Sequence, residues 1–174
     1  MSLLSYLQEQ WFGGPLFYMK EVLGKQGRRF TIRKLRTMSL NAEKEFGQVI
    51  QNGRDQYGKP NKDHRITRMG KMLRKYWIDE IPQIWSLIKG DLRLIGIRAK
   101  GEEEIRTFPE DMQEQILNEK PGLIGIHYSS NGKREYFDVV KEYLEKRKQH
   151  PKRTDVEYFF RTTWNILINS IRST

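Results

Sequence analysis

The stretch RKYWIDEIPQ, residues 74–83, places two adjacent carboxylates just before a proline and organises the fold around them. Upstream of it, an amphipathic helix is predicted by the apolar residues Ile66, Met69, Leu73, Tyr76 and Trp77. Pro82 interrupts this helix, because its ring would clash with the carbonyl of Ile78 and because it donates no N–H. We therefore expect Asp79 and Glu80 to lie at a kink or at a junction between two helices.

Asp79 and Glu80 are the first candidates for chemistry. On a regular helix, adjacent side chains point about 100° apart, whereas a kink can turn both toward one cleft. One carboxylate can attack phosphorus while the other binds a divalent cation or moves a proton. Mg²⁺ suits such a pair, since it takes oxygen ligands and binds substrate phosphates. A solvated helix end is the alternative interpretation of the bare dipeptide.

Basic residues lie on both sides of this pair. The candidates for binding phosphate oxygens are Arg33, Lys34, Arg36, Arg65, Arg68, Arg74, Lys75 and Arg98. An arginine side chain can bind phosphate with two parallel hydrogen bonds. Ordinary solvated charge is the alternative interpretation of each.

Composition limits the classes of function. The 174 residues suit one domain, and the net charge of +10 favours polyanionic partners, namely nucleic acid, anionic lipid headgroups or phosphorylated substrates. The absence of cysteine excludes disulfides and thiolate metal sites. No Walker-type phosphate loop or HExxH zinc motif is present, and the three histidines lack metal-ligand spacing.

Periodicity and turn residues predict an α+β fold, a single helix-rich domain over residues 1–174 with a small β-hairpin or sheet. Strands are expected at Leu16–Lys20, Arg29–Lys34, Leu92–Gly96 and Gly122–Tyr128. Helices are expected around residues 42–50, from Ile66 to Trp77, up to Lys89, over 102–119 with a break at Pro109, and near 134–148 and 155–172. The polar segment Asn52–Arg65 is expected to be a loop.

The last predicted helix has a continuous apolar stripe. Its members are Val156, Phe159, Phe160, Trp164, Leu167, Ile168 and Ile171. Core packing is the preferred interpretation of this stripe, and contact with a membrane is the alternative. No segment approaches the roughly 18 apolar residues of a membrane-spanning helix, so we expect amphipathic helices that could lie on a bilayer rather than cross it.

Four blocks, read in order, resemble the bacterial sugar transferases, the monotopic phosphoglycosyl transferases. The first block is GPLF at 14–17 with FTIRKLRTM at 30–38, and the second is DHRIT at 63–67 with Gly70, Leu73-Arg74 and IDEIPQ at 78–83. The third is GDLRLIGIR at 90–98, and the fourth is KPGLIG at 120–125. The resemblance covers roughly residues 13–127, and it identifies the chain as a catalytic domain of this kind.

The resemblance implies a reaction and a site. In this family the aspartate of the Asp-Glu pair attacks the β-phosphate of a UDP-sugar and releases UMP, and a polyprenyl phosphate then accepts the sugar phosphate. Asp79 is accordingly the expected nucleophile, with Glu80 as Mg²⁺ ligand or base. Asp79 is a further metal candidate. The expected substrate-binding residues are Arg74, Arg98, Lys34, Arg36, Arg65 and Asp91.

The resemblance also implies a place in the cell. The expected partners are a UDP-sugar, a polyprenyl phosphate and the membrane surface at the cytoplasmic face of the bacterial inner membrane. Family members carry a long apolar N-terminal segment, and only 12 residues precede Gly13 here. We therefore expect either a trimmed chain or a divergent form, with residues 1–12 as a remnant of the membrane anchor. Residues 3–12 and the final helix are the candidate anchors.

Two alternatives to an active transferase stay open at this point. The family's Pro-Arg-Pro is Ile97-Arg98-Ala99 here, which favours a non-catalytic relative that binds a nucleotide-sugar or a partner enzyme. The charge of +10 alone suggests a nucleic-acid binder, but no helix-turn-helix, zinc-finger or RNA-binding signature supports it, so we expect no nucleic-acid partner.

Overall fold

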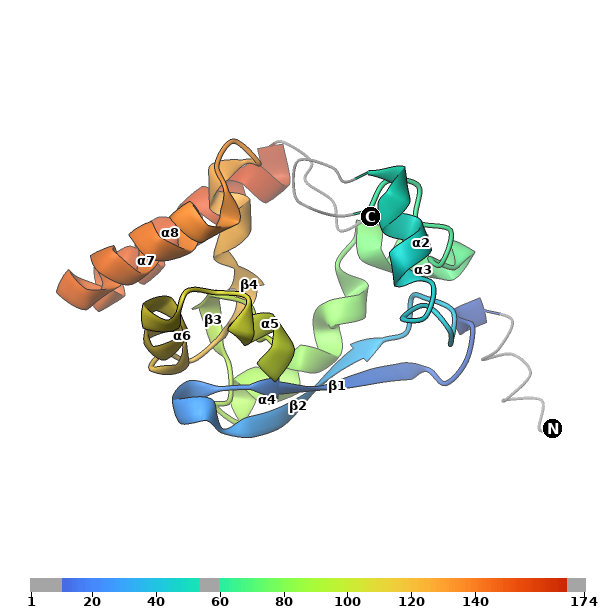
Figure 1. Cartoon of the computed structure of the whole chain (residues 1–174), viewed down its shortest axis with the longest axis horizontal. Helices are drawn as coiled ribbons and strands as arrows, with labels where there is room; N and C mark the ends of the chain where they lie inside the picture. Colours follow the sequence, from blue (N-terminus) through green and yellow to red (C-terminus); the bar gives the residue numbers. More distant parts are fainter. Residues whose placement is uncertain (1–10, 54–59, 169–174) are drawn as a thin grey trace. The chain divides into compact units, whose positions relative to one another are not determined.

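The computed structural model describes residues 11–53 and 60–168 and has the α+β fold predicted from the sequence (Figure 1). Contacts between residues divide the chain into two compact units. Of the described residues, unit 1 contains 11–19, 33–53 and 60–82, and unit 2 contains 20–32 and 83–168. The prediction of one domain over residues 1–174 stays a prediction.

A two-stranded ribbon forms the predicted β-hairpin. Its strands are β1 (Phe17–Leu23) and β2 (Arg29–Leu35), joined by the short 3₁₀ segment η1 (Lys25–Gly27). At the turn, Gln26 and Gly27 adopt positive φ values of 58° and 71°, and Gly24 N–H bonds Arg28 O at 2.8 Å. The hairpin is confirmed, with β1 reaching three residues beyond the predicted end at Lys20.

Unit 1 contains α2 (Phe46–Val49), η2 (Ile50–Asn52), α3 (Arg68–Lys75) and most of the 3₁₀ segment η3 (Ile78–Gln83). The N-cap of α3 is Thr67, whose hydroxyl accepts a 2.9 Å bond from Gly70 N–H. The helix is shorter than predicted: Ile66 pairs with Met38 in a β-bridge, and Trp77, at φ 60°, is left-handed. The break therefore begins at Trp77, before Pro82 is reached, and residues 79–81 lie at a helix junction, as expected.

Unit 2 contains α4 (Ile84–Ile88) and a parallel pair of strands, β3 (Arg93–Gly96) and β4 (Gly122–Gly125), which pair as Arg93 with Gly122 and Ile95 with Ile124. The predicted strand Gly122–Tyr128 is wrong beyond Gly125, where the 3₁₀ segment η4 (Ile126–Ser130) begins. The alternating apolar residues resemble a strand, but β3 ends at Gly96 and provides no further ladder.

Four helices complete the described part of unit 2: α5 (Glu102–Arg106), α6 (Glu110–Leu117), α7 (Tyr136–Gln149) and α8 (Pro151–Ile168). The predicted break at Pro109 is confirmed, since this residue caps α6. A core forms among these elements from Ile95, Ile97, Ile105, Phe108, Met112, Ile116, Ile126, Val139, Val140, Tyr143, Leu144 and Tyr158. The rings of Tyr143 and Tyr158 meet edge to face, with centroids 4.9 Å apart, and join α7 to α8.

Helix α8 starts at Pro151, four residues before the predicted start, and its orientation differs from the prediction. Most of the apolar stripe that was predicted to enter the core is exposed, with only Phe159 packing against the core. The buried residues of α8 are instead Thr154, Tyr158 and Thr162. The preferred interpretation of the stripe as core is therefore wrong for these residues, while Ile171 lies outside the described part.

Membrane anchoring by residues 3–12 falls almost entirely outside the described residues. Over 11–53 and 60–168, none of the helices combines the length and the apolar content needed to cross a bilayer.

Candidate functional site

Asp79 and Glu80 lie in the first turn of η3, directly after the break that follows α3. The break coincides with Trp77, because its left-handed conformation at φ 60° cannot continue a right-handed helix. Such a conformation is strained for a bulky side chain and has to be held by its surroundings. The sequence predicts neither the strained conformation of Trp77 nor the 3₁₀ geometry of η3. Only Pro82 predicts a junction at this point.

The Asp79 carboxylate is buried, with 5% of the residue exposed. Burial, followed by the neighbouring charge of Glu80, raises the pKa of this carboxyl, while Lys34 and Arg74 act in the opposite direction. Among the described residues, its Oδ1 has no hydrogen-bond partner. A buried carboxylate oxygen without a partner is costly to stability and is therefore a marker of function.

Glu80 is held by Lys34 of β2. The Lys34 Nζ and the Glu80 Oε1 are 3.1 Å apart, and the Glu80 side chain is 11% exposed. The interaction joins positions 46 residues apart, so the predicted substrate-binding lysine and the predicted catalytic pair do meet in unit 1. Lys34 thus supplies positive charge to both carboxylates.

Arg74 lies in the last turn of α3, and the negative charges of Asp79 and Glu80 act on its guanidinium. Burial lowers the pKa of its guanidinium, and the charges of Asp79 and Asp63 oppose that change. Its Nε donates a 2.9 Å bond to the hydroxyl of Thr37, which is 7% exposed. A side chain added at Gly70, one helical turn before Arg74, would collide with the carbonyl of Thr37. Close packing of α3 against Thr37 therefore fixes the position of Arg74.

Thr37 belongs to the candidate site, but the sequence did not predict it as a site residue. It lies in the block that resembles the family, yet nothing in composition or spacing marks a hydroxyl as the partner of an arginine so far along the chain. Only the pairing of distant segments reveals it. Lys34, Arg74, Asp79 and Glu80, with Thr37 in support, form what we call the carboxylate centre.

Two other predicted phosphate ligands of unit 1 are engaged elsewhere. Arg65 is 6% exposed and donates two hydrogen bonds to Asp63, from Nε to Oδ1 at 2.7 Å and from Nη2 to Oδ2 at 2.6 Å. Its Nη1 donates a third hydrogen bond to the carbonyl oxygen of Ala42. Arg36 donates from Nε to Pro15 O at 2.7 Å. These contacts give both arginines a structural role, and their role in substrate binding stays a prediction.

The remaining two candidates, Asp91 and Arg98, belong to unit 2. Asp91 follows α4 and lies 3.7 Å from the guanidinium of the exposed Arg28. Arg98 follows β3 and donates to Leu123 O at 3.2 Å, and Gly125 leaves room for the stem of Arg98 and the ring of His127. Their part in the site stays a prediction.

The carboxylate centre has a donor set that fits Mg²⁺ bound together with a diphosphate. Across residues 11–53 and 60–168, acidic and histidine side chains form no group of three or more that could hold a metal ion. Mg²⁺ commonly takes only one or two protein carboxylates and completes its shell with water and substrate phosphates. The unpartnered Oδ1 of Asp79 and the neighbouring Glu80 supply that number of ligands.

Comparison with known proteins gives a family. The sequence model described as "Bacterial sugar transferase" matches residues 1–169, and so includes all the described residues. The chain is 32% identical over 120 residues to "UDP-galactose-lipid carrier transferase" of Erwinia amylovora, an alignment covering 66% of this chain and 25% of the relative. It is equally similar to "Undecaprenyl-phosphate galactose phosphotransferase" of Salmonella typhimurium, with the same coverage of both proteins.

A third relative is more similar over a shorter region. "UDP-N-acetylgalactosamine-undecaprenyl-phosphate N-acetylgalactosaminephosphotransferase" of Aeromonas hydrophila is 39% identical over 103 residues, which is 59% of this chain and 21% of the relative. The chain thus matches about a quarter of the length of these relatives.

Proposed function

The chain belongs to the bacterial sugar transferase family, and from that premise we propose that it transfers a sugar phosphate from a UDP-sugar to a polyprenyl phosphate. The names of the relatives support this class of donor and acceptor, since they specify undecaprenyl phosphate, galactose and N-acetylgalactosamine. The product would initiate a surface polysaccharide or glycoconjugate at the cytoplasmic face of the bacterial inner membrane.

The observation that carries the proposal is the Asp79 carboxylate, which is buried, lacks a hydrogen-bond partner on Oδ1 among the described residues, and is flanked by cations. A carboxylate that is shielded from water is stabilised less by solvation, so it is a stronger nucleophile. Lys34 and Arg74 supply the positive charge that a diphosphate needs as its negative charge redistributes.

The reaction has two balanced steps. A carboxylate oxygen of Asp79 attacks the β-phosphorus, the bond from phosphorus to the bridging oxygen breaks, and UMP leaves with the electron pair of that bond. A phosphate oxygen of the polyprenyl phosphate then attacks the same phosphorus and displaces Asp79, which regenerates the carboxylate and yields a polyprenyl diphosphate sugar. Each step is an in-line displacement at phosphorus, so one pair of cations serves both.

Asp79 and Glu80 are the residues that would hold Mg²⁺. When bound there, the ion would neutralise phosphate charge and help UMP to leave. In the proposed reaction Glu80 would also accept or return a proton of the acceptor phosphate, and its ion pair with Lys34 supports this role.

The deciding experiment follows the protein by intact-mass spectrometry after incubation with a UDP-sugar and Mg²⁺ but without acceptor. We expect UMP to be released once per protein and a phosphosugar adduct to remain, which is discharged when polyprenyl phosphate is added. Asp79→Asn should form no adduct. The matched control is Glu43→Gln, an exposed carboxylate of unit 1 that accepts a 3.2 Å hydrogen bond from the hydroxyl of Tyr18, and it should form the adduct normally.

UMP release that requires both substrates at once, with no adduct, would reject the covalent mechanism but keep the transfer.

A second candidate function, nucleotide-sugar binding without turnover, is favoured by the loop at Arg98, where Ile97 and Ala99 replace prolines of the family pattern. Titration that detects UDP binding in the absence of any UMP release would establish that candidate instead.

A further inference from the structure

Arg98 lies in the loop between β3 and α5, residues 97–101, which we call the Arg98 loop. Neither neighbour of Arg98 is a proline, whose ring would fix φ. Because Ile97 and Ala99 carry no such restraint, contacts with the rest of unit 2 have to set the conformation of the loop. An arginine that binds a phosphate depends on this setting, since a displaced guanidinium loses the paired geometry of its hydrogen bonds.

Backbone hydrogen bonds tie the Arg98 loop at both ends. The N–H of Gly122 in β4 donates to the carbonyl of Ile97 at 2.7 Å, and the N–H of Leu23 in β1 donates to the carbonyl of Lys100 at 2.8 Å. Lys100 thereby forms an isolated antiparallel bridge with Leu23. These bonds do not depend on which side chain stands at position 100, so a substitution there tests the side chain alone.

The side chain of Lys100 lies against two aromatic rings. Its Nζ is 5.5 Å from the centroid of the Phe108 ring and 5.1 Å from that of the Tyr136 ring. The two rings meet edge to face, with centroids 5.9 Å apart. Phe108 is a buried core residue, and Tyr136 packs against the core. A cation at such distances is attracted by both rings, so Lys100 is anchored to a wall that the core holds in place.

Positive charge is crowded around Lys100. Burial lowers the pKa of its ammonium, the charge of Glu104 opposes that change, and the charges of Lys20 and Arg98 add to it. The Glu104 carboxylate is shared, because it also accepts hydrogen bonds from Lys20 and from the N–H of Gly101. Neighbouring cations repel each other, and an anion bound at the loop would relieve that repulsion. The charge arrangement therefore favours an anionic ligand at the Arg98 loop.

We propose that Lys100 is a positioning residue: anchored on the rings of Phe108 and Tyr136, it fixes the Arg98 loop so that Arg98 meets the diphosphate of the donor. The inference rests on the proposed function, because it takes a nucleoside diphosphate as the ligand of Arg98. Lys100 itself touches no substrate, so it acts on binding only through Arg98. The alternative is a filling role, in which the stem of the lysine packs against the rings and its charge has no effect.

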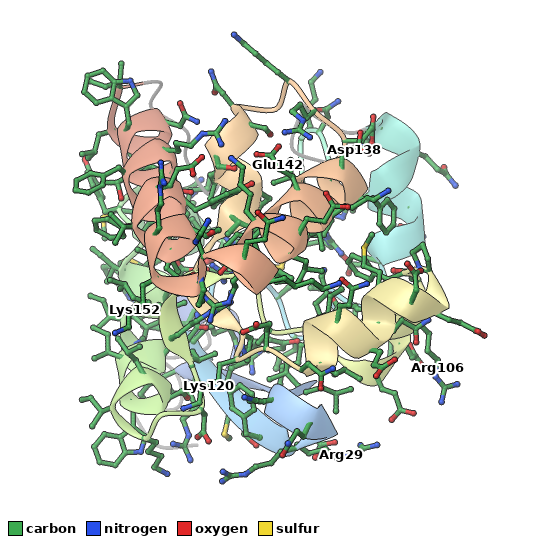
Figure 2. The ribbon with its side chains drawn as sticks, turned by 90° about the vertical axis from the view of Figure 1, so that its left-hand side faces the viewer. Arg29, Arg106, Lys120, Asp138, Glu142 and Lys152 are labelled. Carbon is green, nitrogen blue, oxygen red and sulfur yellow. The ribbon has the colours of Figure 1, made fainter. Side chains whose placement is uncertain are left out.

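The first arm of the test is a calorimetric titration of the full chain with UDP and Mg²⁺. Lys100→Met keeps the length of the side chain without its charge and should weaken UDP binding about tenfold. Lys100→Arg restores a cation that the rings attract and should bind UDP within about threefold of the wild type. Lys152→Met is the matched control, since it removes an exposed ammonium at the start of α8 in the same unit (Figure 2), and it should bind as the wild type does.

The second arm tests coupling to Arg98. Arg98→Gln should itself weaken UDP binding, and adding Lys100→Met to it should cause no further loss, because the lysine acts through the arginine. Additive losses in the double variant would overturn the proposal, as would wild-type binding by Arg98→Gln or by Lys100→Met. Equal weakening by Lys100→Met and Lys100→Arg would assign the filling role instead. Circular dichroism checks that each variant is folded.

UMP release is scored separately from UDP binding. Lys100→Met should raise KM for the UDP-sugar about tenfold and leave kcat within about twofold, since the chemistry at Asp79 is untouched. The predicted pattern of UDP binding without any UMP release rejects the transferase and leaves the role of Lys100 standing. UMP release with an unchanged KM in Lys100→Met rejects the role of Lys100 and leaves the transferase standing. A wild type that binds no UDP also rejects the role of Lys100.

Discussion

The guanidinium of Arg74 and the hydroxyl of Thr37 are joined by a 2.9 Å hydrogen bond across 37 positions of the sequence. The carbonyl of the same threonine accepts the N–H of Thr67, the N-cap of α3, at 3.0 Å. Thr37 therefore holds both the beginning of α3 and the arginine at its end. Through these two bonds it sets where the positive charge stands relative to Asp79.

Replacing Thr37 by valine should lower kcat/KM for UMP release by about tenfold to a hundredfold, because Arg74 loses the partner that orients it. Valine has nearly the shape of threonine and lacks the hydroxyl. Thr37→Ser keeps the hydroxyl and should retain most of the activity. If valine and serine variants were equally active, orientation of Arg74 by this hydroxyl would be rejected.

Asp79→Asn should abolish transfer while leaving the melting temperature at pH 7 equal or about 2–4 °C higher. The pKa of Asp79 is raised in the folded state, so the ionised carboxylate works against folding above that pKa, and the cost is relieved as the pH falls through it. A neutral amide removes the cost. Thermal unfolding of both proteins at pH 7 measures the difference, and a clear loss of stability in Asp79→Asn would contradict the argument.

Gly70→Ala should destabilise unit 1 and reduce activity together. The new Cβ would overlap the carbonyl of Thr37 and push α3 away from it, at a cost of several kcal/mol. Gly47→Ala is the control, since a Cβ there meets no atom within 4 Å, and alanine favours helix over glycine by about 1 kcal/mol. Urea unfolding should show a lower midpoint for the first variant and an unchanged or higher midpoint for the second.

Glu142→Gln should destabilise unit 2 at neutral pH, by an amount that disappears in acid. Burial alone would raise the pKa of Glu142, but hydrogen bonds from Arg134, Lys146 and Tyr158 outweigh burial and lower that pKa to about 2. Because the folded pKa is depressed, the stabilisation is complete above the unfolded pKa of about 4.5 and is lost as the pH falls toward 2. Melting curves of both proteins between pH 2 and pH 7 should converge at the acidic end. A gap that stayed constant with pH would exclude this origin.

Local rules predicted the junction at Asp79 and Glu80 but not its cause. The proline rule placed a break near residues 79–81, and the structure has one. The break itself comes from Trp77, and no propensity favours a bulky residue in the left-handed region, so only tertiary context could reveal it. Likewise, the identity of Thr37 as the partner of Arg74 depends on which segments pack together, and that information is not local.

Periodicity predicted α8 but could not tell which side faces the core. The rule that apolar residues turn inward failed here because Tyr158 and Asn165 find hydrogen-bond partners on the inner side. Similarly, the strand pattern after Gly125 was misleading, since a strand also requires a partner of matching length. The roles predicted for Asp79 and Glu80 came from the resemblance to the family. The match over residues 1–169 supports that resemblance, and the two roles stay predictions.

The hairpin has a consequence for dissecting the molecule. Unit 1 includes residues up to Met19 and resumes at Arg33, so the tip of the ribbon belongs to one unit while its base belongs to the other. Neither unit is a contiguous gene fragment, and no single truncation or protease cut can release one of them intact. Exchange of one unit between family members would therefore have to rejoin the chain at 19/20 and 32/33 as well as at 82/83.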